Sequence, residues 1–174
     1  FSRLMMDRLL WVAGEVNDNM STIVQAQLMF LDSVNNDDIT MHIDSGGGSC
    51  KSGLSMVDVM DYIKSDIKTV NTGMAASMGS ILLGAGTKGK RSSLRFSTTM
   101  LHQSSGGFSG NIQDAAIDWK EWIKVNDTLF GLLGEYCGKD PEQVKKDAER
   151  DLWLDANQAL EYGIIDFIVK NNKK

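Results

Sequence analysis

Histidine is the scarcest side chain in this sequence that could act as a base. Only His42 and His102 occur among 174 residues. A serine nucleophile needs such a base within hydrogen-bond reach. His42 lies in an alternating stretch, with its side chain directed opposite to two apolar neighbours, which indicates a surface or interface position. His102 ends another such stretch and precedes the polar and glycine-rich segment 103–107, so it is the better candidate for a general base.

Ser77 is the most distinctive serine because of its neighbours. The run Gly73-Met74-Ala75-Ala76-Ser77-Met78-Gly79 follows a predicted strand and opens a predicted helix of small apolar residues. A helix N-terminus presents free N–H groups and a positive potential. The pattern Ala-x-Ser-x-Gly is one residue away from the nucleophile elbow of hydrolases. Taken alone, the pattern is more typical of a tightly packed buried helix, so it does not decide the role.

A glycine loop, Asp44-Ser45-Gly46-Gly47-Gly48-Ser49-Cys50-Lys51-Ser52, follows another predicted strand. It ends in Lys-Ser like a phosphate-binding P-loop, but Ser45 and Cys50 occupy the positions where that motif requires glycine. The sequence therefore argues against nucleotide binding. Three glycines leave backbone N–H groups accessible, which fits an oxyanion hole, the docking of a peptide strand or a plain tight turn.

A serine-histidine pair also needs a carboxylate that holds the tautomer of the base. The sequence offers several candidates, and spacing does not choose among Asp44, Asp114, Asp147, Asp151 and Asp155. From the residues alone, the acid stays open.

Composition narrows the class of protein. A length of 174 residues fits one domain, and the net charge of -5 argues against nucleic acid as the main partner. Two cysteines, Cys50 and Cys137, make neither a disulfide framework nor a metal cluster, which favours a cytoplasmic location. Neither residues 1–14 nor the charge-free stretch 69–87 is hydrophobic enough for a signal peptide or a membrane span.

Hydrophobic periodicity predicts the elements that must position these residues. Strands are predicted at about 9–13, 39–43, 67–71 and 164–169, with short strands within 88–102. Helices are predicted at about 21–33, from the glycine loop to 64, and at 75–83, 111–136, 141–150 and 155–162. The order strand, helix, strand in the first half is that of parallel crossover units, so the sequence predicts an α/β fold.

These residues, in this order, resemble the Clp protease family of serine peptidases. The resemblance extends over nearly the whole chain. Besides the run 73–79, its matches include Ser2-Arg3-Leu4, Asp7-Arg8, Ala26-Gln27-Leu28, Lys88-Gly89-Lys90-Arg91, His102-Gln103, Gly106-Gly107-Phe108, Glu149-Arg150-Asp151 and Glu161-Tyr162-Gly163-Ile164-Ile165-Asp166. So many collinear matches are far more specific than any single motif.

The resemblance implies an α/β fold of the ClpP/crotonase-like ββα superhelix type. One domain would comprise a head of residues 1–110 and 138–174 and a long protruding handle helix of about 111–137. The chemistry implied is that of a serine endopeptidase without metal or cofactor. The catalytic triad would be Ser77, His102 and Asp151, and the oxyanion hole would consist of the N–H groups of Gly48 and Met78.

The resemblance also implies where substrate and partners bind. Substrate would lie extended between two segments, pairing through its main chain with Ser49, Cys50, Ser105, Gly106, Gly107 and Phe108. The family forms two stacked seven-membered rings, and this implies oligomer contacts at Glu149, Arg150 and Trp122. A AAA+ ATPase unfoldase would dock near Tyr62.

Some positions depart from the family pattern. Two aromatic positions of the outer docking pocket correspond to Thr40 and His42, which makes recognition of the usual unfoldase uncertain. Two loop prolines are replaced by Gly46 and Ser104, which loosens the loops without removing chemistry.

We therefore expect an ATP-independent peptidase core that degrades unfolded polypeptides to short peptides inside a ring-shaped chamber, fed by an unfoldase. Two alternatives remain open. A crotonase-type acyl-CoA enzyme of the same architecture would need no Ser-His-Asp set. A catalytically weak structural or paralogue subunit of a mixed ring would typically lack a triad residue. Ser77, His102 and Asp151 argue against both.

Overall fold

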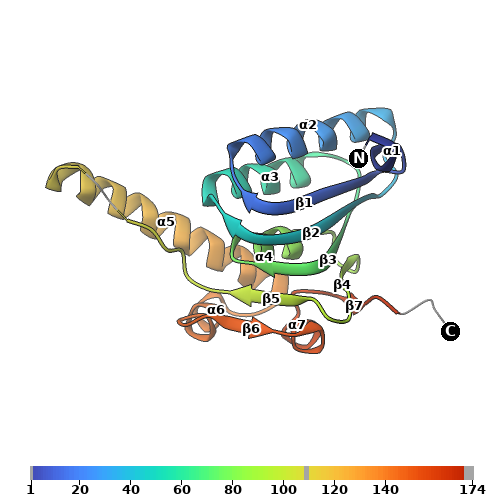
Figure 1. Cartoon of the computed structure of the whole chain (residues 1–174). Coiled ribbons are helices and arrows are strands. Elements are labelled where there is room, and N and C mark those ends of the chain that lie inside the picture. The colour runs from blue at the N-terminus through green and yellow to red at the C-terminus, as the bar shows by residue number, and fades with distance from the viewer. Residues whose placement is uncertain (1, 108–109, 171–174) are drawn as a thin grey trace.

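Parallel strands form the centre of the fold. The computed structural model describes residues 2–107 and 110–170 and shows one mixed sheet of seven strands in these ranges (Figure 1). The strands are β1 Leu9–Val16, β2 Ile39–Gly48, β3 Ile67–Ala76, β4 Arg91–Ser93, β5 Thr98–Leu101, β6 Leu152–Leu154 and β7 Phe167–Ile168. Their order is β1-β2-β3-β4-β7, while β5 pairs with β3 and β6 pairs with β5. All these pairs are parallel except β5 with β6.

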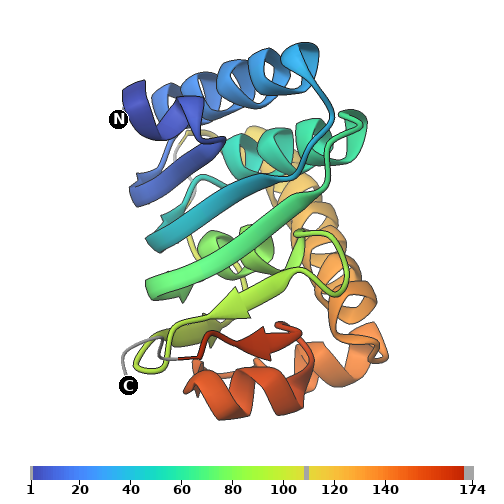
Figure 2. The same ribbon diagram turned by 90° about the vertical axis from the view of Figure 1, so that its right-hand side faces the viewer.

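Helices connect the strands and cover the sheet. They are α1 Ser2–Met6, α2 Asp18–Val34, α3 Cys50–Tyr62, α4 Met78–Gly84, α5 Ile112–Cys137, α6 Pro141–Asp147 and α7 Ala156–Tyr162. Helix α2 packs on β1 and α3, and α4 packs on β2, β3 and α5. In Figure 2, β1, β2 and β3 descend in order, with α2 near the top and α7 at the bottom. Strand residues Ile39, Met41 and Ile43 are fully buried, because alternate side chains of β2 face the core.

Helix α5 projects away from the rest of the chain at its N-terminal end (Figure 1). Its buried side chains lie near its C-terminal end, at Phe130 and Leu133. Towards its N-terminal end it exposes large apolar side chains, including Ile117 and Trp119. A long helix of this kind is the protruding element that the resemblance implies.

The sequence predicts the types of most elements correctly but misplaces several ends. The strand predicted at 67–71 is too short, and the predictions of a turn at Gly73 and a helix from Ala75 are wrong, because β3 continues to Ala76 by pairing with β5. Helix α6 ends at Asp147 rather than near 150, and β7 is only Phe167–Ile168. Two short elements, α1 and β6, were not predicted.

A buried ion pair joins the ends of several elements. The guanidinium group of Arg91, 1% exposed, donates from Nε to Asp166 Oδ2 at 2.9 Å and from Nη2 to Oδ1 at 2.6 Å. It also donates to the carbonyl oxygens of Tyr136 and Gly163 at 2.8 and 3.1 Å. Burial opposes the ionisation of Asp166, but the hydrogen bonds from Arg91 and Gly89 hold the pKa of the carboxyl below its usual value. This pair therefore ties β4 to the ends of α5 and α7.

We predict that Asp166→Asn lowers the free energy of unfolding by about 3–5 kcal/mol, because Arg91 then stays buried without its anionic partner. Asp66→Asn is the matched control, because Asp66 pairs with Lys90 at 2.7 Å on the surface and its side chain is 50% exposed. It should cost less than about 1 kcal/mol. Urea unfolding of both variants measures the difference, and equal losses would contradict the account.

The same pair predicts a pH dependence. Because the pKa of Asp166 is lowered in the folded state, its contribution is present above the carboxyl pKa of the unfolded chain, about 3.9. The contribution is lost as the pH falls through the lower, folded value. The stability difference between the wild type and Asp166→Asn should therefore narrow below about pH 4.

Candidate active site

Ser77 occupies a strained turn between β3 and α4. Its backbone has φ 55° and ψ -124°, a conformation that residues other than glycine seldom adopt. The turn is held from both sides. The N–H of Ser77 donates to the carbonyl of Met100 on β5 at 2.9 Å, and the N–H and hydroxyl of Ser80 donate to the carbonyl of Ser77 at 2.9 and 2.6 Å. The surrounding backbone thus fixes the direction of the Ser77 side chain.

His102 lies beside Ser77 because their strands are paired. Strands β3 and β5 run parallel with Ala76 opposite Met100, so the residues that follow them lie at the same edge of the sheet. The distance from His102 Nε2 to Ser77 Oγ is 2.8 Å, which is a hydrogen bond. The two residues that the sequence singles out therefore lie at the distance that a serine nucleophile and its general base require.

Asp151 approaches the other ring nitrogen of His102. It directly precedes β6, which pairs antiparallel with β5 and sets Leu152 opposite Leu101. The distance from Asp151 Oδ1 to His102 Nδ1 is 3.5 Å, and the side chain of Asp151 is 59% exposed. This contact is looser than the one with Ser77. Among the described residues, Asp151 is nevertheless the one candidate carboxylate of the five that lies within 4 Å of a ring nitrogen of His102. Apo enzymes often show such long contacts, which tighten when substrate binds.

The glycine loop of β2 lies directly against the serine turn. A Cβ atom on Gly47 would lie 2.6 Å from Ser77 Cβ and 2.8 Å from the backbone nitrogen of Met78, so only glycine fits there. Gly47 and Gly48 also have positive φ angles of 91° and 147°. Met78 is the first residue of α4, and its N–H has no acceptor within the helix. The loop therefore brings the backbone of Gly47, the neighbour of Gly48, close to that of Met78.

A cavity of about 400 Å³ lies between the glycine loop and the segment after His102. Its lining includes four residues predicted to bind substrate, namely Ser49, Cys50, Ser105 and Gly107, together with Gly48. Trp122 of α5 also lines this cavity, a position that the sequence analysis assigned only to oligomer contacts. Phe108, which was also predicted to bind substrate, lies outside the described residues.

A smaller cavity of about 20 Å³ reaches Ser77 and His102 themselves. Residues of α5, including Leu129, Phe130 and Leu133, line it opposite the serine. Sequence reasoning missed this contribution, because apolar residues at helical spacing are indistinguishable from ordinary core positions. Cys50 also lines this cavity, but burial raises the pKa of its thiol, which is therefore protonated at neutral pH and a poor nucleophile.

The structure places the residues predicted to contact partners at the surface or at the edge of the sheet. Glu149 and Arg150 are exposed beside Asp151, and Tyr62 is 78% exposed at the end of α3. Thr40 and His42 lie on β2 and pair with Leu9 and Trp11 of the edge strand β1. The ring of His42 is half-buried and stacks on Trp11 with 4.9 Å between centroids, and burial lowers its pKa. No contact in the described residues links His42 to Ser77.

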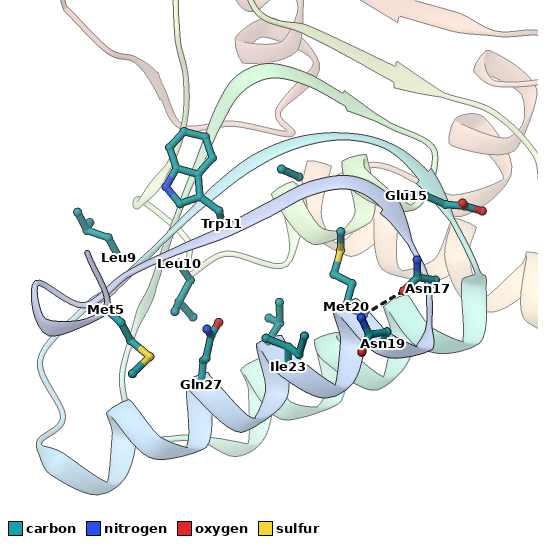
Figure 3. Close-up of a pocket in the computed structure, with 12 residues that line it drawn as sticks. Met5, Leu9, Leu10, Trp11, Glu15, Asn17, Asn19, Met20, Ile23 and Gln27 are labelled. Atoms are coloured by element: carbon teal, nitrogen blue, oxygen red, sulfur yellow. Dashed lines mark hydrogen bonds between the residues drawn. The ribbon is translucent and has the colours of Figure 1, made fainter. Parts of the chain in front are cut away.

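A separate pocket of about 450 Å³ lies between β1 and α2 (Figure 3). Leu10, Met20 and Ile23 give it apolar walls, while the side chain of Trp11 points to the opposite side of β1 in Figure 3. Trp11 lines this pocket, and its indole stacks on His42. Any role of Thr40 or His42 in docking would involve this edge of the sheet and not the serine turn.

Within residues 2–107 and 110–170, no three side chains of His, Cys, Asp or Glu gather where they could hold a metal ion. None of the helices in the same ranges is both long and apolar enough to cross a lipid bilayer.

Comparison with known proteins agrees with this geometry. Residues 1–172 match the Clp protease family. An ATP-dependent Clp protease proteolytic subunit of Porphyromonas gingivalis is 46% identical over 100% of this chain and 79% of its own length. The subunits of the same name from Streptococcus uberis and Streptococcus mutans serotype c are each 45% identical over 99% of this chain and 90% of their own length. The resemblance and the fold class predicted from the sequence are thereby confirmed, and the chain belongs to the Clp protease family of serine peptidases.

Proposed function

We propose that this chain is the peptidase core of a Clp-type protease and cleaves peptide bonds with Ser77 as nucleophile, His102 as general base and Asp151 as orienting acid. The observation that carries the proposal is the 2.8 Å contact between His102 Nε2 and Ser77 Oγ at a strained turn. Strained backbone of this kind persists where the surrounding structure holds it, and it gathers at active sites.

The contacts assign a task to each group. His102 Nε2 takes the proton of Ser77 as Oγ attacks the scissile carbonyl and then gives it to the leaving amine. Asp151 lies on the Nδ1 side and stabilises the imidazolium that forms in between. The N–H groups of Gly48 and Met78 would donate to the developing oxyanion. Water then releases the acyl group by the same steps in reverse order.

Substrate would bind as an added strand in the 400 Å³ cavity. One wall is the backbone of Gly48 to Lys51, and the other is the segment 104–107. Main-chain pairing does not depend on side-chain identity, so this binding mode accepts peptides of many different sequences. Degradation of unfolded polypeptides to short peptides requires such tolerance.

Assembly and feeding complete the proposal. The relatives are named as subunits of an ATP-dependent protease, so the proposed function involves an ATPase partner that delivers unfolded chains to this peptidase. It also involves assembly of the chain into two stacked heptameric rings. The exposed apolar residues of α5, together with Glu149 and Arg150, offer the surface for contacts between rings. Tyr62 and the β1 edge near His42 offer a surface for the ATPase.

The two alternatives lack a supporting observation. A crotonase-type acyl-CoA enzyme has no use for a serine and a histidine in hydrogen-bond contact. A catalytically silent paralogue subunit would typically have lost one of the three side chains. Here all three are present, and His102 contacts Ser77 on one side and Asp151 on the other. The geometry therefore favours an active peptidase.

We predict that Ser77→Ala and His102→Ala each lower kcat for a fluorogenic peptide by about 1000-fold or more. Asp151→Asn should cause a smaller loss, because its carboxylate is exposed and partly screened by water. Ser33→Ala on α2 is the control, since its exposed hydroxyl only donates to the carbonyl of Phe30. Full activity in either alanine variant of the proposed catalytic pair would show that the wrong residues have been chosen.

Alanine substitutions at Gly47 and Gly89 test whether the close contact between the glycine loop and the turn at Ser77 matters for activity. Gly47 and Gly89 have similar φ angles of 91° and 86°, so Ala at either position carries the same backbone strain, about 1–2 kcal/mol. Only at Gly47 does the new methyl group meet Ser77 and Met78, whereas at Gly89 it meets nothing within 4 Å. We predict that Gly47→Ala lowers kcat/KM by about 100-fold and Gly89→Ala by less than about twofold. Equal effects on activity would mean that the loop does not position the nucleophile.

Sedimentation tests the assembly. The expected mass is that of about fourteen chains, each of 19.2 kDa. Ile117→Asp places a charge on an exposed apolar position of α5, 66% exposed, and should shift the sedimenting species towards single rings. A monomeric wild type at micromolar concentration would argue against an enclosed chamber.

A further inference from the structure

The segment after His102 is attached to α5 by a small polar network. The indole N–H of Trp122 donates to Ser104 Oγ at 2.6 Å. The hydroxyl and the backbone N–H of Ser104 each donate to Asn126 Oδ1, both at 3.0 Å. Trp122 and Asn126 lie four residues apart on α5, so they share one face of the helix. We refer to Ser104, Trp122 and Asn126 as the latch.

The indole ring holds the segment at a second point. A Cβ atom on Gly106 would lie only 1.5 Å from an atom of the Trp122 six-membered ring. The backbone of Gly106 therefore rests directly on the indole, and no other residue type fits there without moving the ring. Trp122 thus contacts the segment at both Ser104 and Gly106.

The segment has few other fixed points. It follows the last residue of β5 and belongs to no helix or strand. Apart from the latch, the side chain of Gln103 makes a long hydrogen bond of 3.4 Å to the carbonyl of Glu149. Ser104 occupies a position at which the Clp protease family usually has a rigid proline. Because serine lacks the fixed backbone angle of proline, Ser104 needs contacts with another part of the chain if the segment is to keep one conformation.

We propose that Trp122 is a positioning residue for substrate, because the latch holds segment 104–107 in the extended shape that pairs with a bound peptide. This inference rests on the proposed function and adds to it the device that orders one wall of the cavity. Ser104, Ser105, Gly107 and Trp122 all line that cavity, opposite Gly48 to Lys51. The role differs from the oligomer contact that the resemblance assigns to Trp122.

The latch acts on binding rather than on bond cleavage. His102 is held by its own contacts with Ser77 and Asp151 and by the pairing of β5. Loss of the latch therefore leaves the pair of nucleophile and base in place. It raises the cost of ordering the segment each time an extended peptide binds.

The test compares Trp122→Phe, which keeps a ring over Gly106 but removes the N–H donor, with the wild type. A fluorogenic peptide of about eight residues reports KM and kcat, and a small fluorophosphonate, which needs no paired strand, reports the reactivity of Ser77. We expect KM to rise about three- to tenfold, the range of one lost hydrogen bond. The labelling rate and kcat should change by less than about twofold.

Three further variants sharpen the result. Ser104→Ala removes both the acceptor for the Trp122 N–H and the hydroxyl that donates to Asn126, so it should raise KM at least as much as Trp122→Phe. Adding Trp122→Phe to Ser104→Ala should then raise KM little further, because the bond from Trp122 is already lost. Trp122→Ala also loses the contact with Gly106 and should raise KM further. Trp153→Phe on β6 is the control, since this exposed indole lies outside the latch and should leave KM unchanged. Sedimentation of each variant checks that the assembly is the same as in the wild type.

Amide hydrogen exchange provides a readout that does not depend on activity. The backbone N–H of Ser104 is bonded to Asn126 Oδ1 and should exchange at least about tenfold faster in Trp122→Phe. An unchanged KM and an unchanged exchange rate in that variant would overturn the latch while leaving the proposed function intact. If the wild type neither cleaves peptides nor reacts with the fluorophosphonate, the proposed function fails, and the exchange rate alone then decides whether the latch orders the segment.

Discussion

The proposed active site depends on one strained turn of the backbone, at Ser77. Ser77 has a positive φ angle, which costs of order 1–3 kcal/mol for a residue with a side chain. Three neighbours hold it there: the carbonyl of Met100 on β5, Ser80 of α4 and the close backbone of Gly47 on β2. The turn is thus stabilised by strands that also carry the other parts of the site. A change in the pairing of β2, β3 and β5 would move the proposed nucleophile, the proposed base and the proposed oxyanion donors together.

The three proposed catalytic side chains are not held equally. The serine and the histidine meet at hydrogen-bond distance, whereas the carboxylate of Asp151 is exposed and 3.5 Å from the ring. Asp151 directly precedes β6, a strand of three residues, so its place depends on the pairing of β6 with β5. The Arg91–Asp166 pair holds the ends of α5 and α7 nearby and supports this part of the fold. Assembly or bound substrate would therefore change the position of Asp151 more easily than that of Ser77.

The sequence predicts what depends on residue type and neighbouring pattern. Ser77 and His102 stand out because a serine at a predicted helix start and a scarce histidine at a strand end are chemically distinctive. Asp151 does not, because its position depends on β6, which is too short for hydrophobic alternation to reveal. Resemblance to a family singled it out before the coordinates did. The contact between Trp122 and Ser104 joins residues 18 apart through a tertiary arrangement, and no local pattern encodes it. The same reason explains the error after residue 71, where pairing with β5 extends β3 through Ala75 and Ala76, residues that favour a buried helix.

The central claim is that the Ser77 side chain is the nucleophile, and identification of the modified residue tests it most directly. The assembled wild-type protein is treated with a fluorophosphonate, digested and examined by mass spectrometry for the phosphonylated peptide. The account predicts a single adduct on Ser77, formed in proportion to the loss of peptide cleavage. An adduct on another serine, or full loss of cleavage with Ser77 unmodified, would contradict it.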